Sequence, residues 1–146
     1  MVETVKLYIA GEWTEGSGEA VHELRSPGNG EHIADIPIAS RSDIDRAVTA
    51  ARAAHEEMRH WSAFERADLC SRIAAEVEPL VEEIARIQTL EQGKPYHAES
   101  LDDIQEANQY FLNAAEDVKR LSGEVIPTSD RKKRMFTFHR PVGVWA

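Results

Sequence analysis

The sequence predicts an α/β fold for residues 1–146, and this prediction depends on three observations. Residues 1–40 alternate apolar and polar positions between turn signals, which is typical of short strands. Residues 41–123 repeat apolar positions at the spacing of helix turns, which predicts amphipathic helices. An apolar run at residues 141–146 has the composition of a buried strand that has only begun.

The first predicted strand covers residues 5–9, which follow the period-two pattern of a half-buried strand. Ala10 and Gly11 then form a turn that leads into residues 12–14. Because alanine is strained at positive φ, we expect a positive φ at Gly11 only. Residues 21–25 are predicted to be a second strand.

A third strand is predicted over residues 31–38, after the turn signal Pro27-Gly28-Asn29-Gly30. Pro37 interrupts this segment, and proline has no backbone N–H to donate to a neighbouring strand. We therefore expect the third strand to lie at the edge of its sheet.

The first helix is expected to begin at Ser42, whose hydroxyl can cap the free N–H groups of the first turn. Asp43 and Asp45 lie in that turn, where carboxylates favour the helix dipole. Six residues then share one face of the predicted helix: Ile44, Ala47, Val48, Ala51, His55 and Met58.

A second helical segment begins at Ser62, which has capping-box spacing to Glu65. Its apolar stripe consists of Leu69, Ile73, Val77, Leu80, Ile84 and Ile87. Pro79 lies within the stripe, and its missing N–H predicts a kink or a break into two helices. Gly93 and Pro95 are expected to end the segment.

The third helical pattern spans about residues 97–121 and is expected to end by Gly123. Its predicted inward residues are Leu101, Ile104, Ala107, Phe111, Ala115, Val118 and Leu121. Beyond it, residues 131–140 hold another strand, because Met135 to Arg140 alternate in the period-two pattern.

Composition narrows the class of protein. A formal charge of −9 argues against binding to nucleic acid, which requires basic groups against phosphate. We expect no membrane partner, because no apolar run approaches the roughly 18 residues of a spanning helix. The first residues lack the pattern of a secretory signal, and Cys70, the only cysteine, has no partner for an internal disulfide. A reducing cytoplasm is therefore the expected location.

The run Arg131-Lys132-Lys133-Arg134 is the local exception to the acidic composition. We interpret it as a solvated turn before a strand, with contact to an anion or a partner as the alternative.

No residue of this chain is predicted to bind a metal. His55 and His60 resemble the two histidines of a zinc-protease motif, but that motif requires a spacing of four residues. A spacing of five turns the second ring well around the helix. We therefore expect both histidines to lie at a helix end on the surface.

The sequence also predicts no catalytic and no cofactor-binding residue. Cys70 lies in mid-helix beside Leu69, away from the helix N-terminus or cation that would activate a thiolate, so we interpret it as a small filler. The neighbouring carboxylates Asp102-Asp103 and Glu82-Glu83 do not share a helix face and are expected to be solvated. Neither the dinucleotide fingerprint nor a P-loop occurs.

Five segments, taken in order, nevertheless resemble the aldehyde dehydrogenase superfamily over essentially the whole chain. They are Tyr8 to Trp13, Ser26 to Glu31, Arg66 to Pro95, Gly123 to Pro127 and Arg140 to Val144. Two positions depart from the family pattern. Ala10 stands where asparagine is more common, and Gln92 stands where the family's Glu-Thr-Gly-Lys-Pro motif has threonine. Each segment alone is weak, and their order and spacing carry the resemblance.

The resemblance implies the N-terminal part of an NAD(P)-dependent aldehyde dehydrogenase, incomplete in this chain. In that family a cysteine thiolate attacks the aldehyde, an asparagine and a backbone N–H hold the oxyanion, and a glutamate activates the hydrolytic water. All of these residues lie further along the family's chain. NAD or NADP would be held by the full-length enzyme, and none is expected on this segment alone.

The resemblance further implies a structural role for each region. The helices of residues 41–123 would pack on the dinucleotide-binding domain, whose first strand would be residues 141–146. Residues 131–140 would join a sheet used for association into a homodimer or homotetramer. Ala114 to Leu121 looks more like the semialdehyde and lactaldehyde branches, so a semialdehyde is the expected substrate class.

Two other functions are compatible with the residues. A truncated gene could encode a free-standing interaction module that associates through the strand at residues 134–140, since open strand edges favour pairing. An unrelated helical binding domain would require all five resemblances to be accidental. The gene beyond codon 146 distinguishes an enzyme segment from a module.

Overall fold

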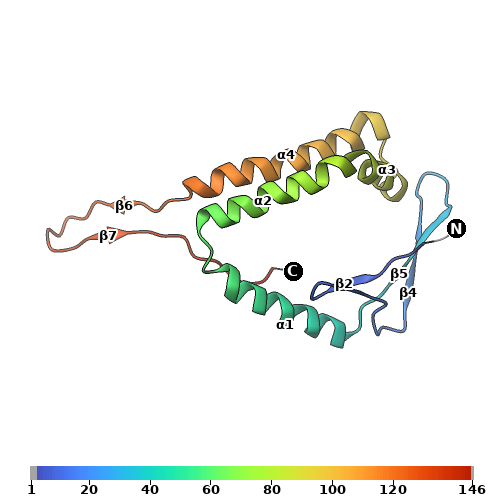
Figure 1. Ribbon diagram of the computed structural model, residues 1–146, viewed down its shortest axis with the longest axis horizontal. Helices are drawn as coiled ribbons and strands as arrows, with labels where there is room; N and C mark the ends of the chain where they lie inside the picture. Colours follow the sequence, from blue (N-terminus) through green and yellow to red (C-terminus); the bar gives the residue numbers. More distant parts are fainter. Residues whose placement is uncertain (1–2, 146) are drawn as a thin grey trace.

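The computed structural model describes residues 3–145, and Figure 1 shows their arrangement. The strands are β1 (Glu3–Thr4), β2 (Leu7–Ile9), β3 (Glu12–Thr14), β4 (Val21–Arg25), β5 (His32–Pro37), β6 (Val125–Ile126) and β7 (Met135–Phe136). The helices are α1 (Arg41–Met58), α2 (Ala63–Val77), α3 (Val81–Gln92) and α4 (Leu101–Asp117). Short helical turns η1 (Glu78–Leu80), η2 (Tyr96–Ser100) and η3 (Val118–Arg120) join them.

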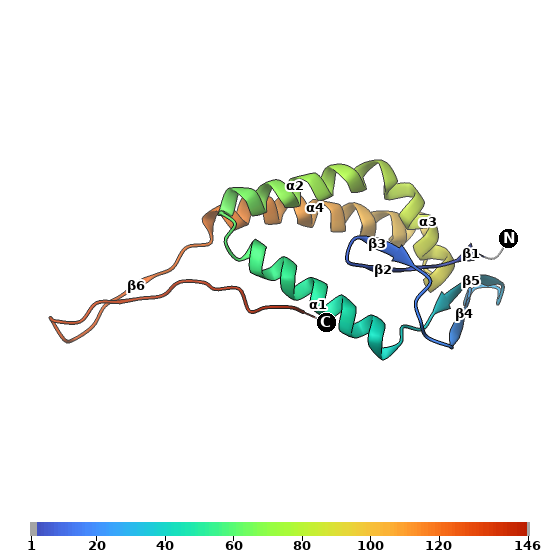
Figure 2. The ribbon, with the colours of Figure 1, turned by 60° about the horizontal axis from the view of Figure 1, so that its bottom comes forward.

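Two helical arms extend from the side of the small N-terminal sheets and meet at the connection between α1 and α2 (Figure 1). α2, α3 and α4 form one arm, with α2 and α4 packed side by side, and α1 forms the other (Figures 1 and 2). The hairpin of β6 and β7 projects from the far end, and the following segment returns beside α1 (Figure 2). Within the described residues, no helix is both long enough and apolar enough to cross a bilayer.

The third predicted strand is central rather than at an edge. β5 pairs with β4 on one side and with β1 on the other, in the order β1-β5-β4. The edge assignment was wrong because β1 pairs with Ala34 and Asp35 on the side expected to be open, although it stops short of Pro37. Pro37 is the last residue of β5 and pairs only with Val21 of β4, so no strand on its other side needs an N–H.

The first predicted strand is divided in two. β1 ends at Thr4, β2 begins at Leu7, and β2 forms a hairpin with β3 in which Ile9 lies opposite Glu12. This register leaves a two-residue loop with φ of 55° at Ala10 and 87° at Gly11. The expectation of positive φ at Gly11 alone was wrong, because a two-residue loop that matches the twist of the strands requires it at both positions.

α1 begins one residue earlier than predicted and has a different cap. Ser40, not Ser42, is the N-cap: its Oγ accepts a hydrogen bond from the Asp43 N–H at 3.2 Å, and the Asp43 carboxylate accepts one from the Ser40 N–H at 3.0 Å. This reciprocal pair is a capping box. The box predicted at Ser62 and Glu65 is confirmed at the start of α2.

The predicted break at Pro79 is confirmed. α2 ends at Val77, Pro79 lies in η1, and α3 begins at Val81. Gly93 ends α3 with a left-handed φ of 73°, as expected for a glycine cap. The third helical pattern occupies η2, α4 and η3 and ends at Arg120.

Few apolar residues are fully buried among those described. They are Ile9, Ala34, Ala67, Ala74, Val81, Ala85 and Ala115. The solvent-accessible surface is 11499 Å², whereas a compact monomer of this size exposes about 7,500 Å². Ala107, Phe111 and Leu121 are exposed although they were predicted to face inward, and the polar Asn108 is buried instead. The predicted apolar stripes therefore include residues that no other part of this chain buries.

The last two predicted strands are shorter or absent. Of residues 131–140, only Met135 and Phe136 form β7, which pairs with β6 alone. Residues 141–145 form no strand, and Ala146 lies outside the described residues. A strand exists only where another strand accepts its hydrogen bonds, so the assignment of residues 141–146 to a dinucleotide-binding sheet stays a prediction.

Candidate functional site

The residues that resembled a metal motif do not converge. His55 is half-buried on α1, whereas His60 is exposed beyond the end of the helix. Among residues 3–145 there is no group of three histidine, cysteine or carboxylate side chains placed to hold a metal ion. The structure therefore assigns these two histidines to different surroundings.

Cys70 is half-buried on α2, which agrees with its interpretation as a filler. The carboxylate pairs differ from one another. Glu82 forms an exposed ion pair with Arg86 at 3.0 Å, as expected for solvated charge. Asp103 is also partly exposed, but it accepts hydrogen bonds from Lys94 and from Gln88.

Lys94 and Asp103 join the end of α3 to α4. The hydrogen bond from the Lys94 ammonium lowers the pKa of Asp103 below its usual value, and the same contact raises the pKa of Lys94. Both side chains remain partly exposed, so the pair adds only modest stability. It acts together with the Thr89 hydroxyl, which donates to the buried Ser100 Oγ at 3.0 Å.

Among the carboxylates of the described residues, Asp43 has the most strongly shifted pKa, and the residue is only 1% exposed. Its Oδ2 accepts hydrogen bonds from the Ser17 N–H at 2.8 Å, the Ser17 Oγ at 2.9 Å and the Ser40 Oγ at 2.8 Å. These donors, led by the Ser17 N–H, hold the pKa of Asp43 far below its usual value. The sequence placed Asp43 only in the first helical turn, because Ser17 meets it only in the folded chain.

This Asp43 cluster fastens the loop before β4 to the start of α1. Gly18, one residue beyond Ser17, approaches the backbone of Ile38 so closely that an added Cβ would lie 1.8 Å from the Ile38 carbonyl oxygen. A carboxylate that is 1% exposed and bonded to protein groups is suited to positioning the chain and is not accessible to a substrate.

An apolar groove runs between α1 and the segment that follows the hairpin. It has a volume of about 450 Å³ and is lined by Ala51, Ala54, His55, Met58, Arg59, Arg66, Pro141, Gly143, Val144 and Trp145. Its two guanidinium groups are already engaged, since Arg66 donates to the Trp61 carbonyl at 2.8 Å and Arg59 pairs with Glu56 at 3.1 Å. The groove offers apolar surface and no nucleophile.

The starts of α1 and α2 lack the turn that holds a dinucleotide. Pyrophosphate binds to the free N–H groups of a helix N-terminus that follows a glycine-rich turn. In α1 and α2 the capping boxes of Ser40 with Asp43 and of Ser62 with Glu65 engage part of these N–H groups and place a carboxylate in the first turn, where it repels phosphate. Neither helix is preceded by the glycine cluster that lets a backbone approach phosphate.

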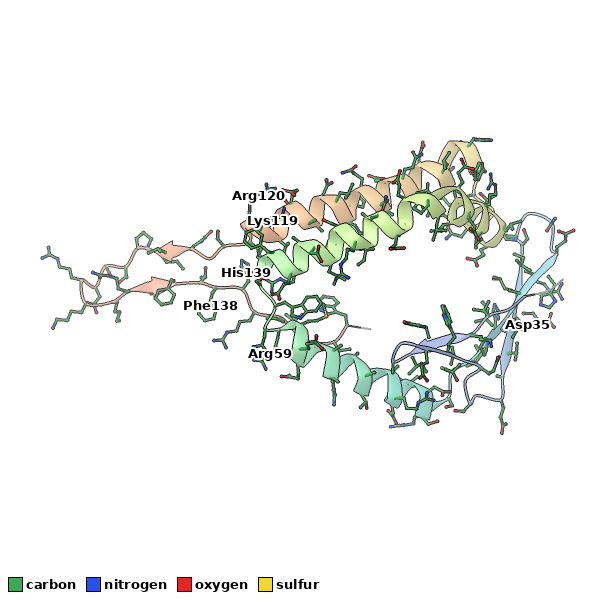
Figure 3. The ribbon with its side chains drawn as sticks, viewed as in Figure 1. Asp35, Arg59, Lys119, Arg120, Phe138 and His139 are labelled. Carbon is green, nitrogen blue, oxygen red and sulfur yellow. The ribbon has the colours of Figure 1, made fainter. Side chains whose placement is uncertain are left out.

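The hairpin carries the basic turn at its tip and aromatic residues at its root. Lys133 lies 3.8 Å from Asp130, Arg134 donates to backbone carbonyls, and all four basic residues are exposed. Figure 3 shows Phe138 and His139 on the segment that follows β7.

Comparison with known proteins assigns this arrangement to one family. The model of the family described as "Aldehyde dehydrogenase family" matches residues 13–146. The chain is 32% identical over 139 residues to the 3-sulfolactaldehyde dehydrogenase of Pseudomonas putida, covering 95% of this chain and 28% of that protein. It is 33% identical over 139 residues to the NADP(+) succinate-semialdehyde dehydrogenase GabD of Escherichia coli (strain K12), covering 94% and 28%.

Solved structures agree in fold. The succinate-semialdehyde dehydrogenase from Burkholderia pseudomallei superposes with a TM-score of 0.79 at 35% identity, covering 89% of this chain and 27% of that one. The lactaldehyde dehydrogenase from Escherichia coli has a TM-score of 0.84 at 24% identity, covering 93% and 28%, and supports the fold alone. The chain thus spans less than a third of the length of the curated relatives that it matches.

Proposed function

The chain belongs to the aldehyde dehydrogenase family, and we propose that it forms the N-terminal scaffold of an NAD(P)-dependent enzyme that oxidises an aldehyde to a carboxylic acid. The family match over residues 13–146 carries this proposal. The share of each relative that the chain covers, about 28%, supports the assignment of the catalytic residues to a part of the enzyme outside these residues.

In this proposal the segment acts by packing and contributes no reacting group. The exposed apolar faces of α1 and of the α2–α4 arm would be covered by the dinucleotide-binding part of the enzyme. Trp145, Phe64 and Leu90 are exposed in the chain described here and would become buried in that assembly. Such large apolar areas on a soluble chain mark surfaces that another part of the protein covers.

We further propose a small polar aldehyde, and a semialdehyde in particular, as the substrate class. The printed names of several relatives support it, among them malonate-semialdehyde dehydrogenase 2 of Bacillus mycoides, which is 31% identical over 145 residues. NAD or NADP would serve as the cofactor, and the cytoplasm is the proposed location. The projecting hairpin of β6 and β7 would associate with a second copy, in a homodimer or homotetramer.

The test uses the complete gene product that contains residues 1–146. We expect it to reduce NAD or NADP when supplied with succinate semialdehyde, malonate semialdehyde or lactaldehyde, and to prefer these over benzaldehyde. Absence of turnover with every aldehyde would contradict the proposed activity. The isolated 146-residue polypeptide is expected to be inactive, and turnover by it would contradict the scaffold role.

A further inference from the structure

The hairpin of β2 and β3 is separate from the other strands of the described residues. β2 and β3 pair only with each other, whereas β1, β4 and β5 form a sheet of their own. The hairpin projects between the two helical arms (Figures 1 and 2). An isolated two-stranded hairpin is marginally stable in water, so its own hydrogen bonds are not sufficient to keep it formed.

The turn at the tip of this hairpin weakens it further. Ala10 has a φ of 55°, in the left-handed region where the Cβ of an L-residue lies too close to the following carbonyl oxygen. Asparagine and glycine are the usual residues in such a two-residue loop, because both tolerate a positive φ. The hairpin therefore carries backbone strain at its tip.

Contact with α1 supports only part of the hairpin. Ile9 is its one fully buried residue, whereas Tyr8 and Trp13 lie on the opposite face and are exposed, with their ring centres 4.9 Å apart. An open groove of about 540 Å³ lies between the tip of the hairpin and a row of alanines on α1, which are Ala47, Ala50, Ala51, Ala53 and Ala54. Opening of the hairpin would thus uncover little apolar surface.

Both ends of the hairpin are anchored to the rest of the fold. Before it, the Val5 N–H donates to the Asp35 carbonyl at 3.0 Å, next to the pairing of β1 with β5. After it, the Ser17 N–H and Oγ donate to the Asp43 carboxylate at 2.8 Å and 2.9 Å. Hydrogen bonds to an ionised group are stronger than those between neutral groups, so the anchor at Ser17 is the stronger one.

Glycines on both sides of Ser17 make this anchor decisive. Gly16 and Gly18 flank it, and glycine loses more conformational freedom on folding than any other residue. Without the hydrogen bonds of Ser17, the loop would regain that freedom, and the end of β3 would no longer be held beside α1.

We propose that the hairpin of β2 and β3 opens as a unit while the helices stay folded, and that the contact of Ser17 with Asp43 controls this equilibrium. Segments with few buried apolar contacts open at a lower free energy than the whole chain. Opening withdraws Ile9 from α1 and relieves the strain at Ala10, and the contact of Ser17 with Asp43 opposes it. The inference does not depend on the proposed enzymatic activity.

The experiment measures amide hydrogen exchange by mass spectrometry in the complete gene product that contains residues 1–146. We expect residues 7–14 to be less protected than α2 and α4. Ser17→Ala is expected to speed the exchange of residues 7–14 about tenfold or more, because it removes a hydrogen bond to a carboxylate. Ser17→Thr keeps the hydroxyl and is expected to stay close to the unaltered protein. Ser71→Ala, at an exposed serine of α2, is the matched control.

Ala10→Asn shifts the same equilibrium in the opposite direction. It is expected to slow the exchange of residues 7–14 about fivefold or more and to leave α2 and α4 unchanged, because asparagine tolerates the left-handed φ. Protection of residues 7–14 equal to that of the helices would overturn the inference, since the hairpin would then open only with the whole chain. Unchanged exchange in Ser17→Ala, or equally fast exchange in Ser17→Thr, would overturn the role of the Ser17 hydroxyl.

Discussion

The ring of Pro27 lies against Gly93: a Cβ added to Gly93 would lie 3.0 Å from the Pro27 Cγ. Pro27 belongs to the turn between β4 and β5, whereas Gly93 ends α3. The contact therefore joins the N-terminal sheet to the end of the α2–α4 arm. The contact requires that residue 93 has no side chain. The left-handed φ of the same glycine also ends α3.

Gly93→Ala is expected to lower the free energy of unfolding by more than the strain of a left-handed alanine, which is about 1–2 kcal/mol. The additional loss comes from the displaced Pro27 ring. Gly30→Ala is the matched control, because Gly30 has a φ of 75° against 73° at Gly93 and no atom within 4 Å of an added Cβ. Chemical denaturation measures both, and an equal loss in the two variants would contradict the role of the contact.

Asp43→Asn is expected to destabilise the chain at neutral pH and to flatten the dependence of its stability on acid. The folded state lowers the pKa of Asp43, so its contribution is present above the unfolded value of about 3.9 and is lost as the pH falls below it. The measurement is the free energy of unfolding between neutral pH and about pH 3. Asp45→Asn, in the same helical turn but exposed, serves as the control. Parallel curves for the unaltered chain and Asp43→Asn would exclude this linkage.

Ala74→Leu is expected to cost about 1–3 kcal/mol of stability, because the larger side chain must displace the packing between α2 and α4. Ala74 is 2% exposed on the face of α2 that packs on α4. Ala75→Leu, on the exposed side of the same helix, is expected to change stability by less than about 0.5 kcal/mol. Thermal unfolding followed by circular dichroism compares the two, and similar melting temperatures would contradict the assigned packing face.

The isolated 146-residue polypeptide is expected to bind 8-anilinonaphthalene sulfonate and to self-associate. Its apolar stripes and the groove beside α1 lack the surface that the remainder of the proposed enzyme would supply. Dye fluorescence and light scattering measure this, with the complete gene product as the comparison. A monomeric polypeptide that melts cooperatively without binding the dye would contradict the proposed uncovered faces.

Features with local causes could be predicted from the sequence. The capping box of Ser62 and Glu65, the break at Pro79 and the end of α3 at Gly93 all occur as expected. Each depends on groups within one helical turn, either a hydroxyl and a carboxylate at the right spacing, a missing N–H, or a backbone without a Cβ. The family resemblance belongs with them, since order and spacing along the chain carry it.

The tertiary structure alone decided the features that depend on distant residues. Ser17, far back in the sequence, donates two hydrogen bonds to the Asp43 carboxylate, and only the folded chain brings the two residues together. The cap at Ser40 is different, because its spacing to Asp43 is as local as that of Ser62 to Glu65, and the prediction of Ser42 overlooked it. Pro37 ends a central strand because β1 stops short of it. Residues 141–145 remain without a strand because pairing requires a neighbour. The local pattern determines what a segment can form, and the partners that fold against it determine what it does form.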